Sequence, residues 1–445
     1  MRKVVWLLVV LFAVAMVFSS TVTLNVTADQ KTSTPVPFRI SMWELLELIG
    51  EDFDVNWDSL RVLDALNHEL PFQIDDIDGN GKLSSDDLLI FLFNGSAKIV
   101  VSDEFDIEPA SYDPVFAVKE ENGKQFVEHI YVPFKVEVDN HGLTHVVKYG
   151  SLEGDIFKEL GIARVAGWVG STYYIDGNLG KHEEKVSYDF KPMEMRILKP
   201  GPVCTTVVSK LRSDLFLGLT QTIVSHIFAT GEILVDSTFE FGTYADLMKL
   251  QIMATHPLTD IDPEALHVLP VFRRLVWAEQ LNTTPFDYWK SRDAIEIVDG
   301  KPYIVFPATD SMKPLWWGAT YIFASMEDWR ANYSKKYGVF VSEILPSHPV
   351  VYSNLEKFVY GNTWVYESRE FRDGLFRWIP GEFNAYEATK GAVSETLADW
   401  VAHFKAGDKV TFTRLFAVRR SGSVEDTIRY LEKRAHEFQS ISISK

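Results

Sequence analysis

The chain has 445 residues, of which 46% are hydrophobic and 24% charged, as in an ordinary globular protein long enough for two or three domains. Its formal net charge of −18 argues against nucleic acid and anionic membrane surfaces as partners. The single cysteine, Cys204, excludes an intramolecular disulfide, and its valine neighbours indicate a buried strand thiol rather than a nucleophile.

The first residues predict an export signal. A short positive region, Arg2-Lys3, precedes an uncharged apolar run of about 15 residues, which is short for a membrane span. We expect a secretory signal over residues 1–28, cleaved between Ser20 and Ala28, with an uncleaved N-terminal anchor as the alternative. The rest of the chain predicts no integral membrane domain. The expected location is therefore secreted or at the extracellular cell surface.

A polar, proline-containing stretch over residues 29–40 predicts a linker. Ser41 and Glu44 have the spacing of a capping box, and the apolar pattern that follows predicts a short helix ending at Gly50. Alternating or solidly apolar runs then predict strands, at residues 59–64, 70–74 and 88–93.

Residues 76–87, which lie between two of these strands, have the ligand spacing of a twelve-residue calcium loop. Oxygen-bearing side chains occupy loop positions 1, 3 and 5, and Gly81 at position 6 permits the sharp turn. We predict calcium as the cofactor, in a structural role, and an acidic surface turn without metal is the alternative. The expected ligands are Asp76, Asp78, Asn80, Lys82 through its backbone carbonyl, Ser84 and Asp87.

The loop resembles those of dockerin and EF-hand proteins, because Asp76, Asp78, Asn80 and Gly81 keep the motif and Asp87 at position 12 is followed by leucine. This resemblance implies metal ligation. Dockerins carry two such loops in tandem and enter each from a helix. This chain has one, preceded by the strand-like residues 71–74, so we do not expect cohesin binding.

Residues 112–418 are dominated by strand patterns separated by turn signals. We therefore predict a mainly β fold. A small N-terminal domain with the calcium loop would span residues 41–140, and a large antiparallel β-sandwich would span 141–420. The C-terminal segment 421–445 predicts a helix that Ser423 caps and that packs on the outside of the sandwich.

Aromatic residues make up 13% of the chain, including 12 tryptophans. Trp316 and Trp317 are adjacent, so in a strand they cannot both face one core, and they are candidates for a sugar-binding platform. Core packing is the alternative. Arg273, Glu279 and Glu370 are candidates for acid–base chemistry on glycosides or uronic acids. For these three, the alternative is a solvated strand face. The motifs of serine hydrolases, zincins and nucleotide-binding enzymes are absent from the sequence.

The chain also contains four Asn-x-Ser/Thr sequons, which would be surface positions if the host glycosylates exported proteins, at Asn25, Asn94, Asn282 and Asn332.

Residues 180–420 resemble the β-supersandwich of mutarotase-like proteins and of several polysaccharide lyases. The segment Leu269–Trp277, the aromatic stretch around Trp316 and the late strand after Asp408 carry the resemblance. It implies a carbohydrate-facing role. The first hypothesis is a secreted, calcium-binding β-sandwich that binds carbohydrate or processes polysaccharide, as a lyase or glycosidase if it is an enzyme. The alternatives are a non-catalytic cell-surface or envelope structural protein and a calcium-dependent adhesion module.

Overall fold

The structure is a computed structural model. It describes residues 20–50, 53–159, 164–169, 172–176, 190–214, 216–251, 255–258, 260–270, 285–291, 293–307, 321–325, 328–346, 350–352, 357–359, 362–367, 376–384 and 402–445. The chain divides into a smaller unit, residues 1–113 with 440–445, and a larger unit, residues 114–439. No helix among the described residues is both long and apolar enough to span a bilayer.

The smaller unit contains two antiparallel sheets. In sheet order, one consists of β3 (Asn56–Asp64), β6 (Ser96–Ser102), β1 (Thr21–Thr27) and β32 (Ser442–Ser444). The other consists of β2 (Val36–Ser41), β5 (Leu88–Phe93) and β4 (Phe72–Asp75). Ala97, Ile99 and Val101 of β6 are buried, which reflects the alternation that the sequence predicts for a strand with one face in the core.

The predicted short helix is confirmed as α2 (Met42–Ile49). The Ser41 hydroxyl accepts a hydrogen bond from the Glu44 N–H at 3.2 Å, and the Glu44 carboxylate accepts one from the Ser41 N–H at 3.2 Å. These reciprocal bonds satisfy two backbone donors at the helix start. Gly50 follows the helix with φ of 106°, a backbone conformation that favours glycine.

The two units differ from the predicted domain boundaries. Residues 36–40, assigned to the linker, belong to β2, which pairs along its length with β5. Pro37 is tolerated there because β2 lies at the edge of its sheet, where a missing N–H breaks no ladder. The change of unit falls at 113/114 rather than at 140/141. Beyond the C-terminal helix, β32 returns to the smaller unit and pairs with β1.

Residues 21–27, which the sequence places inside the export signal, form β1 and pair with β6 over all seven positions. Cleavage at the Ser20 end of the expected window would keep this strand intact. Cleavage near Ala28 would remove it from the sheet.

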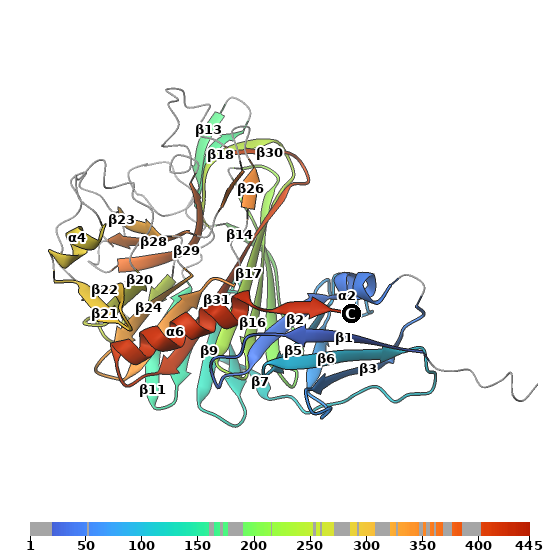
Figure 1. Cartoon of the computed structure of the whole chain (residues 1–445). Helices are drawn as coiled ribbons and strands as arrows, with labels where there is room; N and C mark the ends of the chain where they lie inside the picture. Colours follow the sequence, from blue (N-terminus) through green and yellow to red (C-terminus); the bar gives the residue numbers. More distant parts are fainter. Residues whose placement is uncertain are drawn as a thin grey trace, which may run out of the picture. The chain divides into compact units, whose positions relative to one another are not determined.

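The larger unit is built from two large antiparallel sheets, shown in Figure 1. The main path of the first follows β13 (Thr172–Asp176), β12 (Arg164–Val169), β18 (Ala245–Gln251), β29 (Phe376–Asn384), β19 (Thr255–Pro257), β11 (Leu152–Glu159), β10 (Thr144–Tyr149), β9 (Phe134–Val138), β8 (Lys124–His129) and β7 (Phe116–Glu121). Off this path, β28 (Asn362–Glu367) joins β29, β23 (Tyr321–Ser325) joins β28, and β30 (Ala402–Phe404) joins β18.

The second sheet follows β14 (Lys191–Ile197), β15 (Cys204–Arg212), β16 (Leu219–Phe228), β17 (Glu232–Phe241), β31 (Lys409–Arg420), β25 (Val339–Ile344), β24 (Trp329–Ser334), β20 (Leu266–Pro270), β22 (Lys301–Pro307) and β21 (Ile295–Val298). A separate pair joins β26 (Val350–Tyr352) to β27 (Lys357–Val359), and α4 spans Pro285–Lys290.

The two large sheets share one hydrophobic core. Val136, Val146 and Phe157 from the first sheet and Ile223, Val235 and Phe412 from the second belong to a single buried cluster. The rings of Phe157 and Phe416 lie 4.8 Å apart between the sheets. The prediction of a mainly β fold with a large antiparallel sandwich is therefore confirmed.

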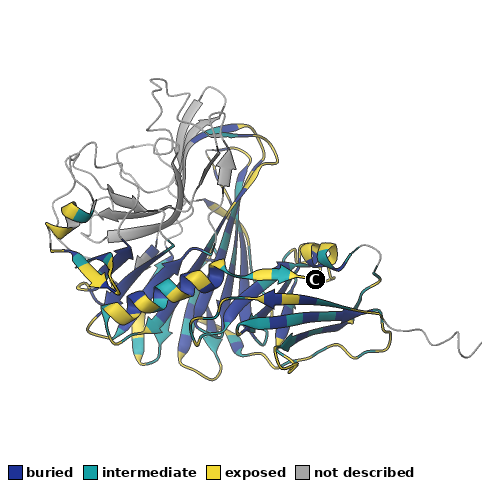
Figure 2. Cartoon of the chain, in the orientation of Figure 1, coloured by how far each residue is buried: buried dark blue, intermediate teal, exposed yellow. Residues whose placement is uncertain are grey.

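The predicted C-terminal helix is confirmed as α6 (Val424–Gln439). Ser423 caps it by accepting a hydrogen bond from the Asp426 N–H at 3.1 Å. The helix packs against β24 and β25 of the second sheet, through a face that includes Ile428, Leu431 and Phe438. Figure 2 shows its opposite face as exposed, as expected for a helix on the outside of a sandwich.

One of the four sequons is not a surface position. Asn332 lies in β24 with no exposed surface, and its amide donates to the Pro257 carbonyl at 3.2 Å. A glycan does not fit there in the folded chain. Asn25 and Asn94 are exposed, and Asn282 lies outside the described residues.

Candidate cation site

The predicted calcium loop connects two paired strands. It follows β4 and precedes β5, and the last residue of β4, Asp75, pairs with the first of β5, Leu88. This pairing brings the loop ends Asp76 and Asp87 together. In an EF-hand, the two helices that flank the loop hold its ends together instead. The absence of an entering helix, expected from the alternation before the loop, is confirmed by β4.

Three carboxylates converge within this loop. Asp76, Asp78 and Asp87 each offer an oxygen, and these oxygens lie within 4.8 Å of one another. Asp87 is buried, Asp76 is half-buried and Asp78 is exposed. Like charges at this separation repel one another, and a divalent cation placed among them reverses the sign of that interaction.

The loop backbone turns toward the first and last carboxylates. The carboxylate of Asp76 accepts from the N–H groups of Gly79 at 2.6 Å and Gly81 at 2.9 Å. The carboxylate of Asp87 accepts from the Ser84 N–H at 2.8 Å. Gly81 has φ of 72°, so the glycine at position 6 makes the expected sharp turn. These bonds fix both carboxylates without a metal and leave further lone pairs for one.

The remaining predicted ligands lie in the same loop. The Asn80 N–H donates to the Asp78 carboxylate at 2.9 Å, and this bond is the main reason that the pKa of Asp78 lies below its usual value. Burial raises that pKa, and the Ser84 hydroxyl and Asp76 lower it. The Asn80 side-chain oxygen accepts from the Lys82 N–H at 2.7 Å, and its second lone pair allows it to ligate a cation as well.

The structure therefore brings together Asp76, Asp78 and Asp87, the three carboxylates of the predicted set. The other predicted ligands, the Asn80 oxygen, the Lys82 carbonyl and the Ser84 hydroxyl, belong to the same loop and stay predictions. The candidates Arg273, Glu279, Trp316, Trp317 and Glu370 all lie outside the described residues.

The predicted buried thiol is confirmed. Cys204 has no exposed surface in β15, and its sulfur lies 3.7 Å from the Thr206 hydroxyl. His226 is also buried, with Nδ1 2.8 Å from the same hydroxyl.

A charged group inside the larger unit was missed by sequence reasoning. Arg414 and Glu343 are fully buried, and the Arg414 Nε lies 3.0 Å from a Glu343 oxygen. Arg330, also buried, pairs with Glu343 in the register of β24 and β25. Glu343 in turn pairs with Phe416, a core residue, so these side chains point to the inner face of the sheet.

Burial shifts the acid–base behaviour of this group. It lowers the pKa of Arg414 to about 10, with Glu343 acting to raise that value and Arg330 to lower it further. On the next strand, burial lowers the pKa of His267 to about 3, so this imidazole is neutral at physiological pH. One sequence pattern could have revealed this group. Arg414 is a charged residue in a strand whose alternate residues 410, 412, 416 and 418 are apolar, so it shares their buried face.

A second polar group occupies the end of β11. Glu159 is fully buried and accepts from the Thr144 N–H at 2.7 Å. Burial raises the pKa of Glu159 to about 8, the bond from Thr144 lowers it, and the nearby Asp139 raises it. His145, which lies 3.8 Å from Asp139, has a pKa that burial lowers.

Comparison with known proteins shows no matching family model and no matching curated protein. Among solved structures, an alpha-mannosidase from Enterococcus faecalis V583 aligns with a TM-score of 0.45 and 9% identity over 95% of this chain and 46% of that one. A putative aldose 1-epimerase from Klebsiella pneumoniae aligns with a TM-score of 0.39 and 9% identity over 74% and 89%. A GalM/aldose epimerase homologue from C. elegans gives 0.35 and 10% over 69% and 100%.

This chain thus spans about half the length of the mannosidase. Two of these three matches are of the mutarotase type that the sequence resembles. At such TM-scores and identities they assign neither an activity nor a ligand to this chain.

Proposed function

We propose that the chain binds Ca²⁺ in the loop Asp76–Asp87 and that the ion stabilises the smaller unit. The observation that carries the proposal is the convergence of Asp76, Asp78 and Asp87 within 4.8 Å on a connection between paired strands. Calcium fits better than magnesium because it accepts six to eight oxygens in irregular geometry, including backbone carbonyls. The Asn80 side-chain oxygen, the Lys82 carbonyl and the Ser84 hydroxyl are the proposed remaining ligands of such a shell.

The proposed role is structural because the loop closes a hairpin whose strands are buried. Phe72 of β4 and Leu89 and Phe91 of β5 belong to the core, so fixing the loop also fixes their pairing. An unfolded chain cannot gather the ligands, and binding energy therefore adds to folding energy. At a free Ca²⁺ concentration 100 times the dissociation constant, the gain is about 2.7 kcal/mol.

The experiment is thermal unfolding of the intact chain in excess chelator and in calcium, paired with calorimetric titration of Ca²⁺. We expect a higher melting temperature in calcium. Asp78→Asn should lose most of this response. Asp86→Asn is the matched control, because Asp86 is an exposed acid of the same loop outside the converging group. Identical melting curves with calcium and with chelator would show that the loop has no such role.

The proposal includes export of the chain, since extracellular calcium is high enough to saturate even weak sites. N-terminal sequencing of protein recovered outside the cells tests this part. A mature end between residues 20 and 28 is expected, and recovery only from the cytoplasm contradicts it.

We further propose that the larger unit binds or processes carbohydrate. What supports this is the group Arg330, Glu343 and Arg414 on the inner sheet face, close in the strand register to neutral His267. Buried charges are destabilising unless they are well paired, and ionisable groups with shifted pKa values concentrate at functional sites. Because all three side chains are fully buried, we assign them to holding the sheet that would carry a sugar site rather than to contact with the sugar itself.

Incubation with neutral and acidic polysaccharides, followed by product analysis and a glycan array, tests this second part. Glu343→Gln and Arg414→Lys should reduce binding or turnover at equal folded fraction. Asp299→Asn, which changes an exposed carboxylate of the same unit, should not. Absence of both binding and products would favour the alternative of a non-catalytic cell-surface protein.

A further inference from the structure

A pocket of about 490 Å³ lies beside the calcium loop, within the smaller unit. Its walls come from β3, from β4, from the loop itself and from a segment at residues 109–110. Its volume falls within the range of roughly 300–1,000 Å³ that small-molecule sites occupy. The residues that the argument uses are Trp57, Asp58, Phe72, Asp76, Lys82 and Asp87.

The pocket has an apolar wall of fixed shape. Trp57 is half-buried in it, and Leu60 and Phe72 behind it are buried. Phe72 is held by an edge contact with Tyr112 at 5.5 Å between ring centroids. The Tyr112 hydroxyl donates in turn to Glu69, which anchors the second ring. An aromatic surface fixed in this way suits a ligand with one apolar face.

The lining also contains acidic and polar residues. Asp58, Asp76 and Asp87 contribute three negative charges and Lys82 one positive charge. An anionic ligand would be repelled by this lining. A divalent cation shared by Asp76, Asp78 and Asp87 would leave that group with one negative charge, while Asp58 and Lys82 offset each other, so an anion stays disfavoured. The occupied site would then suit a neutral molecule that donates hydrogen bonds to carboxylates.

We propose that this pocket binds a neutral carbohydrate ring, with its C–H face against Trp57 and its hydroxyls toward the acidic residues of the lining. A pyranose combines an apolar face with several hydroxyl donors and is uncharged, which matches both kinds of lining residue. The proposal rests on calcium binding in the loop, because Asp76 and Asp87 belong both to the cation site and to the pocket.

This sharing couples the two ligands. Calcium bound by Asp76 and Asp87 offsets the charge of two residues that line the sugar pocket, so each ligand should raise the affinity for the other by the same factor. We expect glycoside affinity to fall at least roughly tenfold when calcium is removed, a coupling of about 1.4 kcal/mol.

The experiment uses the full chain and ligand-observed NMR with methyl glycosides of glucose, mannose and galactose, and with glucuronate as the anionic comparator. Each probe is measured in calcium and in excess chelator. We expect binding of at least one neutral glycoside in calcium, weaker binding in chelator and weaker binding of glucuronate. Failure of all three neutral glycosides to bind in calcium overturns the proposal, as does glucuronate binding at equal strength.

Trp57→Ala should lose glycoside binding, and Trp57→Phe should retain part of it while keeping the wall filled. Trp43→Ala is the matched control, since Trp43 is 58% exposed on α2 of the same unit. Binding that survives both Trp57 variants lies elsewhere in the chain and contradicts the proposal. Calcium-dependent melting of the same samples separates the outcomes: glycoside failure with a normal calcium response rejects the pocket alone, whereas loss of the calcium response rejects the cation site.

Discussion

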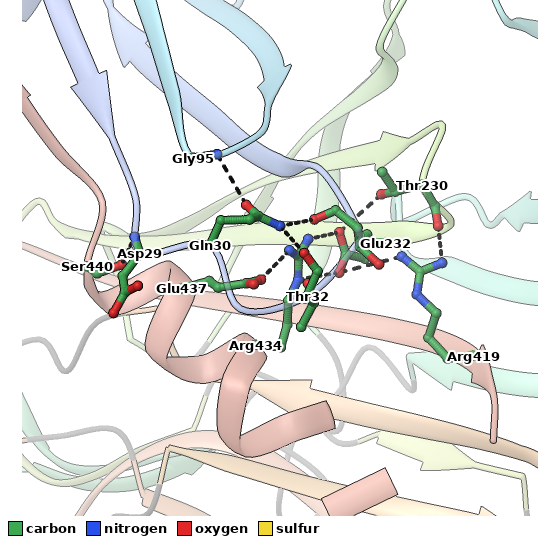
Figure 3. A network of polar contacts seen from close by, with 11 residues as sticks. Asp29, Gln30, Thr32, Gly95, Thr230, Glu232, Arg419, Arg434, Glu437 and Ser440 are labelled. Atoms are coloured by element: carbon green, nitrogen blue, oxygen red, sulfur yellow. Dashed lines mark hydrogen bonds and ion pairs between the residues drawn. The ribbon is translucent and has the colours of Figure 1, made fainter. Parts of the chain in front are cut away.

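Arg434 of α6 and Glu232 of β17, which are 202 residues apart, form a fully buried bidentate ion pair. The Arg434 Nε and Nη2 donate to the two Glu232 oxygens at 3.0 and 2.7 Å. Figure 3 shows this pair together with Glu437, which accepts from Arg434 Nη1 at 2.7 Å, and Arg419, which lies 3.6 Å from Glu232. Burial is the largest influence on Arg434 and lowers its pKa, but Glu232, Tyr430 and Glu437 together outweigh burial, so the net pKa is raised. The guanidinium therefore stays charged and joins the helix to the sheet.

Removing one partner of this pair should destabilise the larger unit strongly. Arg434→Met leaves Glu232 with the more distant Arg419 and the Thr230 hydroxyl, and it removes the bond to buried Glu437. We expect a loss of about 3–5 kcal/mol. Thermal and urea unfolding measure it. Arg429→Ala is the control, because that arginine lies on the same helix in an exposed pair with Asp299. Equal losses of unfolding free energy in the two variants would show that the buried pair contributes no more than the exposed pair.

These long-range partners mark the limit of what the sequence predicts. The caps at Ser41 and Ser423 and the spacing of Asp76 to Asp87 are local, so residues within a few positions determine them. Strand alternation likewise indicates which face is buried. No sequence pattern links Glu232 to Arg434, because their contact depends on the order of the strands in the sheet.

The return of the chain end to the smaller unit was equally unpredictable. Ser442 pairs with Thr27, 415 residues away, and the short polar strand around it has no pattern that predicts a strand. The charged group at Arg414 was missed for another reason. From the sequence alone, a charged residue in a strand is expected to face solvent. The burial of Arg414 is understood only when its neighbours on other strands, Glu343 and Arg330, are known.

Glu159 should make the stability of the larger unit depend on pH. Its pKa in the folded state is about 8, above the usual 4.5, because the carboxyl is buried. The stabilising contribution of the protonated form is complete below pH 4.5 and is lost as pH rises toward 8. We expect the free energy of unfolding to fall over this range, with a limiting slope of about 1.4 kcal/mol per pH unit.

Urea unfolding of the wild type and Glu159→Gln between pH 5 and pH 9 measures this contribution. The amide cannot ionise, so the variant should gain stability relative to wild type as pH rises. His145 has a lowered pKa and acts in the opposite direction at acidic pH, but it is present in both proteins and cancels in the difference. A constant difference between the two proteins across the range would contradict the assignment.

The turn at Gly142 brings one large sheet into close contact with the other, and it should not accept a side chain. Gly142 follows β9 with φ of 78°, and a Cβ there would lie 2.5 Å from the Ser209 Cβ on β15. The Ser209 hydroxyl donates to the carbonyl of His141, so the contact fixes both partners. Gly142→Ala should therefore combine left-handed backbone strain of about 1–2 kcal/mol with a clash that the turn cannot relieve locally.

Gly123→Ala separates the two effects, because Gly123 has a similar φ of 77° but would place its Cβ in open space. We expect a clearly larger drop in melting temperature for Gly142→Ala than for Gly123→Ala. Equal drops would mean that backbone strain alone requires the glycine, and that the two sheets have room to separate at this turn.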